Sequence, residues 1–290
     1  VIKNGEGPTL LFVGGNHGGE YEGVVTLLKL IRELQPEEIS GRVIIIPSLN
    51  LPAVQAGTRM SPIDGRDMNR SFPGQYNGTV SQMIAHYVHE AILPLCDAVI
   101  DLHSGGYSLD LYAYNSMHYL PDEDQRERTM AALKAFNAPV SLVMQEFTGE
   151  GLLDYAVEEM GKVFLCAEIG GRGILTPTTL KIAEEGVQNM LIHFGMIEGE
   201  LPEITTRLME VPATGNYAYA RSNGVYEPFF GLGEVVETGA AVGQVHYPED
   251  PLREPETMHV ERGGILVGTR GPGFVERGDC VAVTAEDFEV

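Results

Sequence analysis

The sequence is poor in basic residues and contains no long hydrophobic run. Nineteen lysines and arginines stand against 41 acidic residues, which gives a formal net charge of −22. Phosphate binding needs a basic surface, so this balance argues against a nucleic acid partner. The apolar runs are only as long as strands, and we therefore expect no membrane-spanning helix and no membrane partner. No basic amino-terminal segment of the signal-peptide type is present, so a signal peptide is not predicted.

Cysteine is also scarce. The three cysteines, Cys96, Cys166 and Cys280, are an odd number and lie far apart in a chain of 290 residues. This usage is typical of reduced thiols in a cytosol rather than of a disulfide framework. We therefore expect a cytoplasmic protein in which Cys96 and Cys166 are small core residues. The sequence is compatible with a homo-oligomer.

What the chain does contain is a regular alternation of strand and helix patterns from residue 1 to about residue 200. Hydrophobic residues make up 43% of the chain, enough for one large or two moderate domains. Apolar runs predict strands over 9–13, 42–47, 98–102, 140–143 and 162–167. Helical spacing predicts helices over 22–34, 80–93, 122–136, 152–159 and 177–194. The alternation predicts an α/β fold with a mixed or parallel sheet and helices on both faces.

After about residue 204 the pattern changes to short segments rich in Val, Ile and Tyr, separated by glycine turns. This texture predicts a smaller all-β unit. The polar linker near 200–206 sets the boundary, so that 1–202 form a catalytic domain and 203–290 a second domain. The second domain resembles the barrel-sandwich fold of biotinyl and lipoyl domains. It lacks a lysine at the hairpin that would carry such a cofactor, and we interpret it as a scaffold rather than a carrier.

A glycine-rich turn, residues 14–23, joins the first predicted strand to the first predicted helix and contains His17 and Glu20. In an open α/β sheet this edge is where ligands bind. His103 leaves another predicted strand in a similar context, and a catalytic zinc site usually has three protein ligands. We therefore predict that His17, Glu20 and His103 hold one Zn²⁺ per chain, the alternative being hydrogen-bonded structural residues. Asp101 shares a side of its strand with His103 and could orient that imidazole.

Hydrolysis at a metal also needs a group that moves protons, and Glu168 is the candidate. It closes a predicted apolar strand and precedes a glycine turn. A carboxylate in such surroundings should have a partner or a function. The alternative is a capping or salt-bridged glutamate. The remaining histidines, such as His118, carry no comparable motif.

The stretch 49–79 has no clear period and is dense in polar residues, which is typical of an ordered binding loop. Within it, Asn69 and Arg70 are suited to hold a substrate carboxylate, because arginine presents a planar fork and asparagine adds a neutral donor. Arg59 or Arg66 could polarise the scissile carbonyl. We favour Arg59, although a surface salt bridge is an alternative for either arginine.

Four short motifs occur in order: residues 17–20, residues 67–70, His103 and Glu168. Together they resemble the succinylglutamate desuccinylase/aspartoacylase family, which belongs to the zinc carboxypeptidase-like enzymes. The resemblance spans residues 9 to about 195, and the β-rich tail fits the two-domain layout of that family. It implies zinc ligands at His17, Glu20 and His103, a general base at Glu168, a carboxylate-binding pair at Asn69 and Arg70, and a carbonyl-polarising residue at Arg59. Arg59 stands further from Asn69 than in the aspartoacylase pattern, which leaves Arg66 open for the last role.

Members of this family cut an amide between an acyl group and an amino acid. The segments 57–74 and 168–171 are similar to the branch that deacetylates N-acetyl-2,4-diaminobutyrate. We therefore predict a zinc-dependent amidohydrolase that removes an acetyl or succinyl group from a small N-acyl amino acid. The alternatives are a metallocarboxypeptidase acting on short peptides and a non-catalytic binding module with the same fold. A tyrosine lid from the second domain would be Tyr217, Tyr219 or Tyr226.

Overall fold

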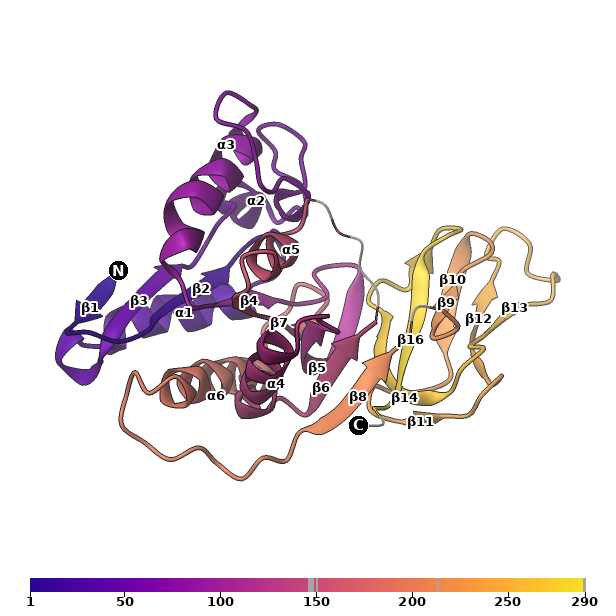
Figure 1. Ribbon diagram of the computed structural model, residues 1–290. Helices are drawn as coiled ribbons and strands as arrows, with labels where there is room; N and C mark the ends of the chain where they lie inside the picture. The colour runs from indigo at the N-terminus through magenta and orange to yellow at the C-terminus, as the bar shows by residue number, and fades with distance from the viewer. Residues whose placement is uncertain (146–148, 150, 213, 289–290) are drawn as a thin grey trace.

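The computed structural model describes residues 1–145, 149, 151–212 and 214–288. These residues form a mixed α/β fold around a twelve-stranded sheet (Figure 1). Its strands lie in the order β1 (Ile2–Asn4), β3 (Gly41–Ile46), β2 (Thr9–Gly14), β4 (Ala98–His103), β7 (Val163–Gly171), β5 (Leu109–His118), β6 (Val140–Met144), β8 (Arg207–Val211), β16 (Cys280–Asp287), β14 (Gly264–Arg270) and β11 (Val235–Val236), with β9 (Tyr217–Tyr219) paired to β16.

Helices cover both faces of the amino-terminal half of this sheet (Figure 1). Residues Leu10 and Phe12 of β2 pack in one core with α1 (Glu22–Glu33), α4 (Glu123–Phe136) and α6 (Pro177–His193). Their neighbours Leu11 and Val13 point the other way, into a core with α3 (Val80–Tyr87) and α5 (Leu153–Glu158). Because β2 is buried on both faces, its sequence is an unbroken apolar run. Within the described ranges, no helix combines the length and apolarity that crossing a membrane requires.

The predicted strands and helices of the amino-terminal part are present, most with ends shifted by only one residue. The predicted helix 80–93 differs, because α3 ends at Tyr87 and continues as a π turn (Val88–Ile92) and a 3-10 turn (Leu93–Leu95). The stretch 49–79 contains α2 (Leu51–Ala56) and a 3-10 turn (Met68–Arg70) where we expected only loop. A further 3-10 turn spans Pro36–Glu38.

The largest difference from the expected elements is β5, a ten-residue strand that the sequence did not predict. It runs antiparallel to β7 and parallel to β6. Polar and aromatic residues interrupt its apolar positions, because one of its faces lines a cavity instead of a helix. A pattern search for buried strands therefore passes over it.

The carboxyl-terminal strands do not stand apart from this sheet. Strand β8 pairs in parallel with β6, and β14 pairs with β5. A second sheet, β13 (Glu256–His259), β12 (Ala241–His246), β10 (Gly224–Pro228) and β15 (Phe274–Val275), packs against them through residues such as Val245 and Leu266. The region is rich in strands, as expected. Its independence as an all-β domain is not confirmed, because backbone hydrogen bonds cross the expected boundary.

The three parallel strands β2, β4 and β7 end at the same edge of the sheet. The turns that follow them carry the residues singled out by the sequence. Strand β5 returns from this edge beside β7, so that its side chains extend the same surface away from the strand ends. The topology therefore brings His17 and Glu168, which are 151 positions apart in the sequence (168 − 17), to the same edge of the sheet.

Candidate metal and substrate site

The turn after β2 has a backbone conformation and close contacts that favour glycine. Gly15 and Gly19 have φ angles of 61° and 91°, which residues with a side chain rarely adopt. At Gly18 an added Cβ would lie 1.9 Å from the carbonyl oxygen of Ala53, and the Gly18 N–H donates to the Thr58 carbonyl at 2.9 Å. The turn is therefore packed against α2 and the residues that follow it, and this contact fixes where His17 and Glu20 point.

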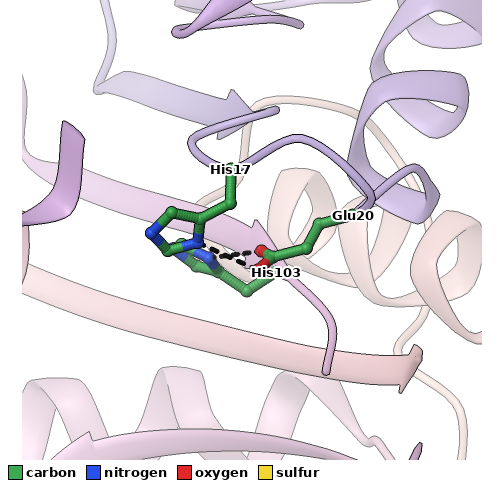
Figure 2. Close-up of side chains that lie close together, drawn as sticks. All are labelled: His17, Glu20 and His103. Atoms are coloured by element: carbon green, nitrogen blue, oxygen red, sulfur yellow. Dashed lines mark hydrogen bonds and ion pairs between the residues drawn. The ribbon is translucent and has the colours of Figure 1, made fainter. Parts of the chain in front are cut away.

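His17, Glu20 and His103 converge on one point (Figure 2). The Nδ1 atom of His17 lies 2.9 Å from Oε1 of Glu20, and the Nδ1 atom of His103 lies 2.8 Å from Oε2. One potential ligand atom from each residue lies within 4.8 Å of the other two, and all three side chains are buried. Two imidazoles and one carboxylate are the donor set of a catalytic zinc site with three protein ligands. The residues present fit a divalent cation.

A second layer of carboxylates holds the two imidazoles. The Nε2 atom of His103 lies 2.8 Å from Oδ2 of Asp101, which also accepts a hydrogen bond from the Asn16 amide at 3.2 Å. The Nε2 atom of His17 lies 2.9 Å from Oδ1 of Asp67. Hydrogen bonds of this kind fix the ring orientation of metal-ligating histidines and leave the other nitrogen for the metal. The contact of Asp101 with His103 agrees with the expectation from strand alternation.

The electrostatics of the cluster favour positive charge. Burial disfavours a charge on His103, but Asp101 and Glu20 outweigh burial and raise its pKa well above the ordinary value. Burial acts to raise the pKa of Glu20, yet hydrogen bonds and charge interactions with His103 and His17 lower it to about 2. The imidazoles thus hold protons more tightly while the Glu20 carboxylate stays ionised, and a divalent cation would compete with those protons for the ring nitrogens.

Glu168 lies beside this cluster. In the register of the parallel strands β4 and β7 it is the direct partner of His103. Strand β7 continues to Gly171, so Glu168 lies inside the strand and does not close it as we expected. Burial, with a contribution from Glu20, raises the pKa of Glu168 to about 8, although His103 acts to lower it. Its side chain lines the same cavity as the three potential ligands, so it can exchange protons with a group bound there.

The polar loop brings Arg59, Asn69 and Arg70 to the cavity wall. The Arg59 guanidinium donates to Asp67 at 3.1 Å and lies 3.9 Å from Glu20. The Asn69 side-chain oxygen accepts the backbone N–H of Leu153 at 3.1 Å, which ties the loop to α5. Because these three residues line the cavity, their side chains can contact a polar ligand bound there.

Arg66 is placed differently from the other loop residues. It is exposed, and it is not among the residues that line the cavity. Its backbone N–H donates to the Asp64 carboxylate at 3.3 Å. Of the two arginines considered for the carbonyl, only Arg59 lies at the candidate site.

The cavity measures about 490 Å³ and extends from the cluster of His17, Glu20 and His103 to residues of the carboxyl-terminal strands. Apolar side chains make up much of its wall, including Leu111, Leu142, Phe164, Val211, Val267 and Val283. Its size suits a small organic molecule. Of the three tyrosines considered as a lid, Tyr217 lines the cavity, whereas Tyr219 and Tyr226 are not among its lining residues.

Several cavity residues carry no sequence motif and were missed. Tyr107 fits its ring into the space left by Gly19 and Gly173, where an added Cβ would lie 2.5 Å and 2.2 Å from ring carbons. His118, which we set aside, lines the cavity together with Asp154 and Glu158. The two acidic residues lie four positions apart on α5, a helical spacing that puts both on one face, and this was the only available signal.

Comparison with known proteins is consistent with this geometry. Residues 6–194 match the model of the succinylglutamate desuccinylase/aspartoacylase catalytic domain. The chain is 43% identical over 291 aligned positions to the N-alpha-acetyl-L-2,4-diaminobutyric acid deacetylase of Halomonas elongata, covering 100% of this chain and 85% of that protein.

Solved structures give the same picture. The product-bound ectoine utilization protein EutE (DoeB) from Ruegeria pomeroyi is similar, with a TM-score of 0.95 and 40% identity over 98% of this chain and 87% of that one. A succinylglutamate desuccinylase/aspartoacylase from Rhodobacter sphaeroides matches with a TM-score of 0.95 and 43% identity, over 100% and 88% of the two chains. Both the domain match and these whole-length similarities show that the chain belongs to the succinylglutamate desuccinylase/aspartoacylase family.

Proposed function

We propose that this protein is a zinc-dependent amidohydrolase that removes an acyl group from an N-acyl amino acid. The observation that carries the proposal is the grouping of His17, Glu20 and His103 with Glu168 on the wall of one small cavity. Deacylation of an amino acid needs a Lewis acid, a proton acceptor and an anchor for the carboxylate, and each has a candidate here. The name of the Halomonas relative supports a deacetylase.

His17, Glu20 and His103 would hold the zinc ion. When bound, zinc supplies Lewis acidity and lowers the pKa of a coordinated water to about 7. In our proposal Glu168 accepts a proton from the attacking water and later donates it to the leaving amine nitrogen. The raised pKa of Glu168 suits a group that must both take up and release a proton near neutral pH.

Arg59, Asn69 and Arg70 would bind the substrate. We propose that Arg70 and Asn69 hold the α-carboxylate, since a guanidinium and an amide both donate hydrogen bonds to it. Arg59 lies within 3.9 Å of Glu20 and would donate to the acyl oxygen as this atom gains negative charge. Arg66 would serve neither role, because it lies outside the cavity.

The substrate is a small molecule in this proposal. Strands β8, β9, β14 and β16 contribute cavity-lining residues. In our proposal these strands leave no room for a peptide chain beyond the acyl group. This arrangement favours an acetylated or succinylated amino acid over a peptide. The name of the Halomonas relative puts Nα-acetyl-2,4-diaminobutyrate first among the candidates.

We further propose that the two parts of the chain expected from the sequence have different roles. Residues 1–202 would carry the metal and its chemistry, and residues 203–290 would shape the cavity through their strands. We also propose a cytoplasmic location, and a homo-oligomer is compatible with the fold.

The decisive experiment measures metal content and substrate range together. Protein purified without chelator is analysed for metals and then assayed with acetylated and succinylated amino acids and with short peptides. We expect about one zinc per chain and hydrolysis of at least one N-acyl amino acid, with little peptide cleavage. Activity should disappear on chelation and return with zinc. A protein that binds no divalent metal, or that cleaves only peptides, would contradict the proposal.

A further inference from the structure

The wall of the cavity continues along β5 and β7, away from the cluster of His17, Glu20 and His103. In the register of these strands Tyr114 faces Glu168, and Ser116 faces Cys166. His118 follows two residues later on the same face of β5, roughly 13 Å beyond Tyr114 at the usual rise of a strand. All of these residues line the cavity. A ligand bound at the cluster of His17, Glu20 and His103 can therefore extend along this surface.

Helix α5 places two acidic residues over this surface. The Glu158 carboxylate accepts a hydrogen bond from His118 Nδ1 at 2.8 Å, and His118 Nε2 lies 4.0 Å from Oδ2 of Asp154. The three side chains are between 10% and 19% exposed. Two carboxylates face one imidazole, so this end of the cavity has an excess of negative charge even when His118 is protonated.

Asp154 lies at the end of α5 that contacts the polar loop. The preceding residue, Leu153, donates its backbone N–H to the Asn69 side chain at 3.1 Å, and Asn69 lines the cavity together with His17 and His103. Glu158 lies about one helical turn further along α5. Burial raises the pKa of both carboxyl groups, and His118 acts to lower both. Asp154 is therefore the first of the two carboxylates along α5 from the loop that carries Asn69.

The Asp154 carboxylate also has capacity for another donor. Its Oδ1 atom accepts the backbone N–H of Tyr155 at 2.6 Å. Its Oδ2 atom is 4.0 Å from His118 Nε2, which is too long for a hydrogen bond. A carboxylate accepts several hydrogen bonds, and an ammonium group supplies up to three.

We propose that Asp154, backed by Glu158 and His118, selects substrates whose side chain ends in a primary ammonium group. The inference rests on the proposed deacylase function and adds the residues that determine its specificity. A second, independent observation points to the same ligand chemistry: a relative that matches the whole chain is named for a 2,4-diamino acid. Such a substrate carries an ammonium group on its side chain, and a largely apolar cavity would exclude that charge without an acidic partner.

The test compares two substrates of nearly equal shape, Nα-acetyl-2,4-diaminobutyrate and Nα-acetylnorvaline, which differ by an ammonium in place of a methyl group. We expect the zinc-loaded protein to prefer the ammonium substrate in kcat/KM by on the order of 100-fold. In Asp154→Asn that preference should fall by roughly 10- to 100-fold, and in Glu158→Gln by less. Glu159→Gln is the matched control, because it removes the same charge from an exposed neighbouring position that does not line this cavity.

A binding measurement separates this inference from the proposed reaction. Calorimetry with free 2,4-diaminobutyrate and norvaline should show the same preference and the same loss in Asp154→Asn. A protein that hydrolyses neither amide but retains this binding preference would contradict the deacylase function and support the acidic determinant. Equal preference in wild type and Asp154→Asn, or none for the ammonium in wild type, would overturn the inference even if acetylated amino acids are hydrolysed.

Discussion

His103 and Glu168 are direct partners in the register of the parallel strands β4 and β7. Side chains at paired positions of neighbouring strands point to the same face of the sheet. The pairing therefore sets a potential metal ligand and a potential proton acceptor side by side without help from any loop. A slip of one residue in either strand would turn one of the two side chains into the helical core on the opposite face.

The pairing leads to a prediction for Glu168→Gln. The amide keeps the size of the side chain but cannot accept the proton from water, so we expect kcat to fall by about 10²- to 10⁴-fold. The zinc content should stay at the wild-type level, because Glu168 is not among the three potential ligands. Steady-state assays with the best N-acyl amino acid and metal analysis of the same preparation check both halves. Activity within a few-fold of wild type would remove Glu168 from the proposed role.

Asp67 carries a second prediction. Its carboxylate contacts Nε2 of His17 at 2.9 Å and also accepts from Arg59. In Asp67→Asn we expect zinc affinity to fall by roughly 10- to 100-fold, because a metal-bound histidine loses its carboxylate partner. Competition with a chromophoric chelator measures the affinity. Since Arg59 would also move, kcat/KM measured at saturating zinc should fall as well. An unchanged chelator titration would show that Asp67 does not support the metal ligands.

The grouping of residues at the candidate metal site could largely be predicted from the sequence because its signals are local. His17, Glu20, His103 and Glu168 each lie within or just after an apolar run and near glycines, and parallel strands bring such positions to one edge. Strand alternation also gave the contact of Asp101 with His103. These inferences needed only the position of each residue in its own strand.

The other end of the cavity could not be predicted in this way. His118 meets Glu158 across 40 residues of sequence, and no spacing encodes that contact. Strand β5, which carries His118, was missed because its cavity face is not uniformly apolar. The backbone hydrogen bonds between β6 and β8 could not be predicted either. The composition of the chain changes near residue 204, but the sheet continues across that point. Tertiary contacts decided each of these points.

Gly18 provides a test of the turn that positions His17 and Glu20. An added Cβ would lie 1.9 Å from the Ala53 carbonyl oxygen and 2.5 Å from that of Thr58, and both are backbone atoms that cannot rotate away. We expect Gly18→Ala to lower zinc affinity by more than tenfold and to destabilise the protein by about 1–3 kcal/mol. Chelator competition and urea unfolding measure the two effects. Gly273→Ala is the control, because no atom lies within 4 Å of the added Cβ. Equal behaviour of the two variants would contradict the close packing of the turn.

Asp64 ties the polar loop to the start of α3, and its titration predicts a pH dependence. The carboxylate accepts the backbone N–H of Ser81 at 2.8 Å and the Ser81 hydroxyl at 2.9 Å. Although burial opposes it, these hydrogen bonds lower the pKa of Asp64 from 3.8 to about 2. A lowered pKa stabilises the folded state fully above the unfolded-state pKa near 3.8, and this contribution is lost as pH falls through about 2.

In Asp64→Asn we therefore expect a loss of about 1 kcal/mol in the free energy of unfolding at pH 6, because solvent screens much of the interaction, with a smaller difference from wild type at pH 3. Urea unfolding at the two pH values measures it. Asp124→Asn is the control, since the side chain of Asp124 is 83% exposed and pairs only with Arg128 in the described structure. Because Asp64 precedes Arg59's partner Asp67 by three residues, loosening the loop should also raise KM for the N-acyl substrate. A difference from wild type that grows as the pH falls toward 3 would contradict the assigned role, because it has the opposite sign.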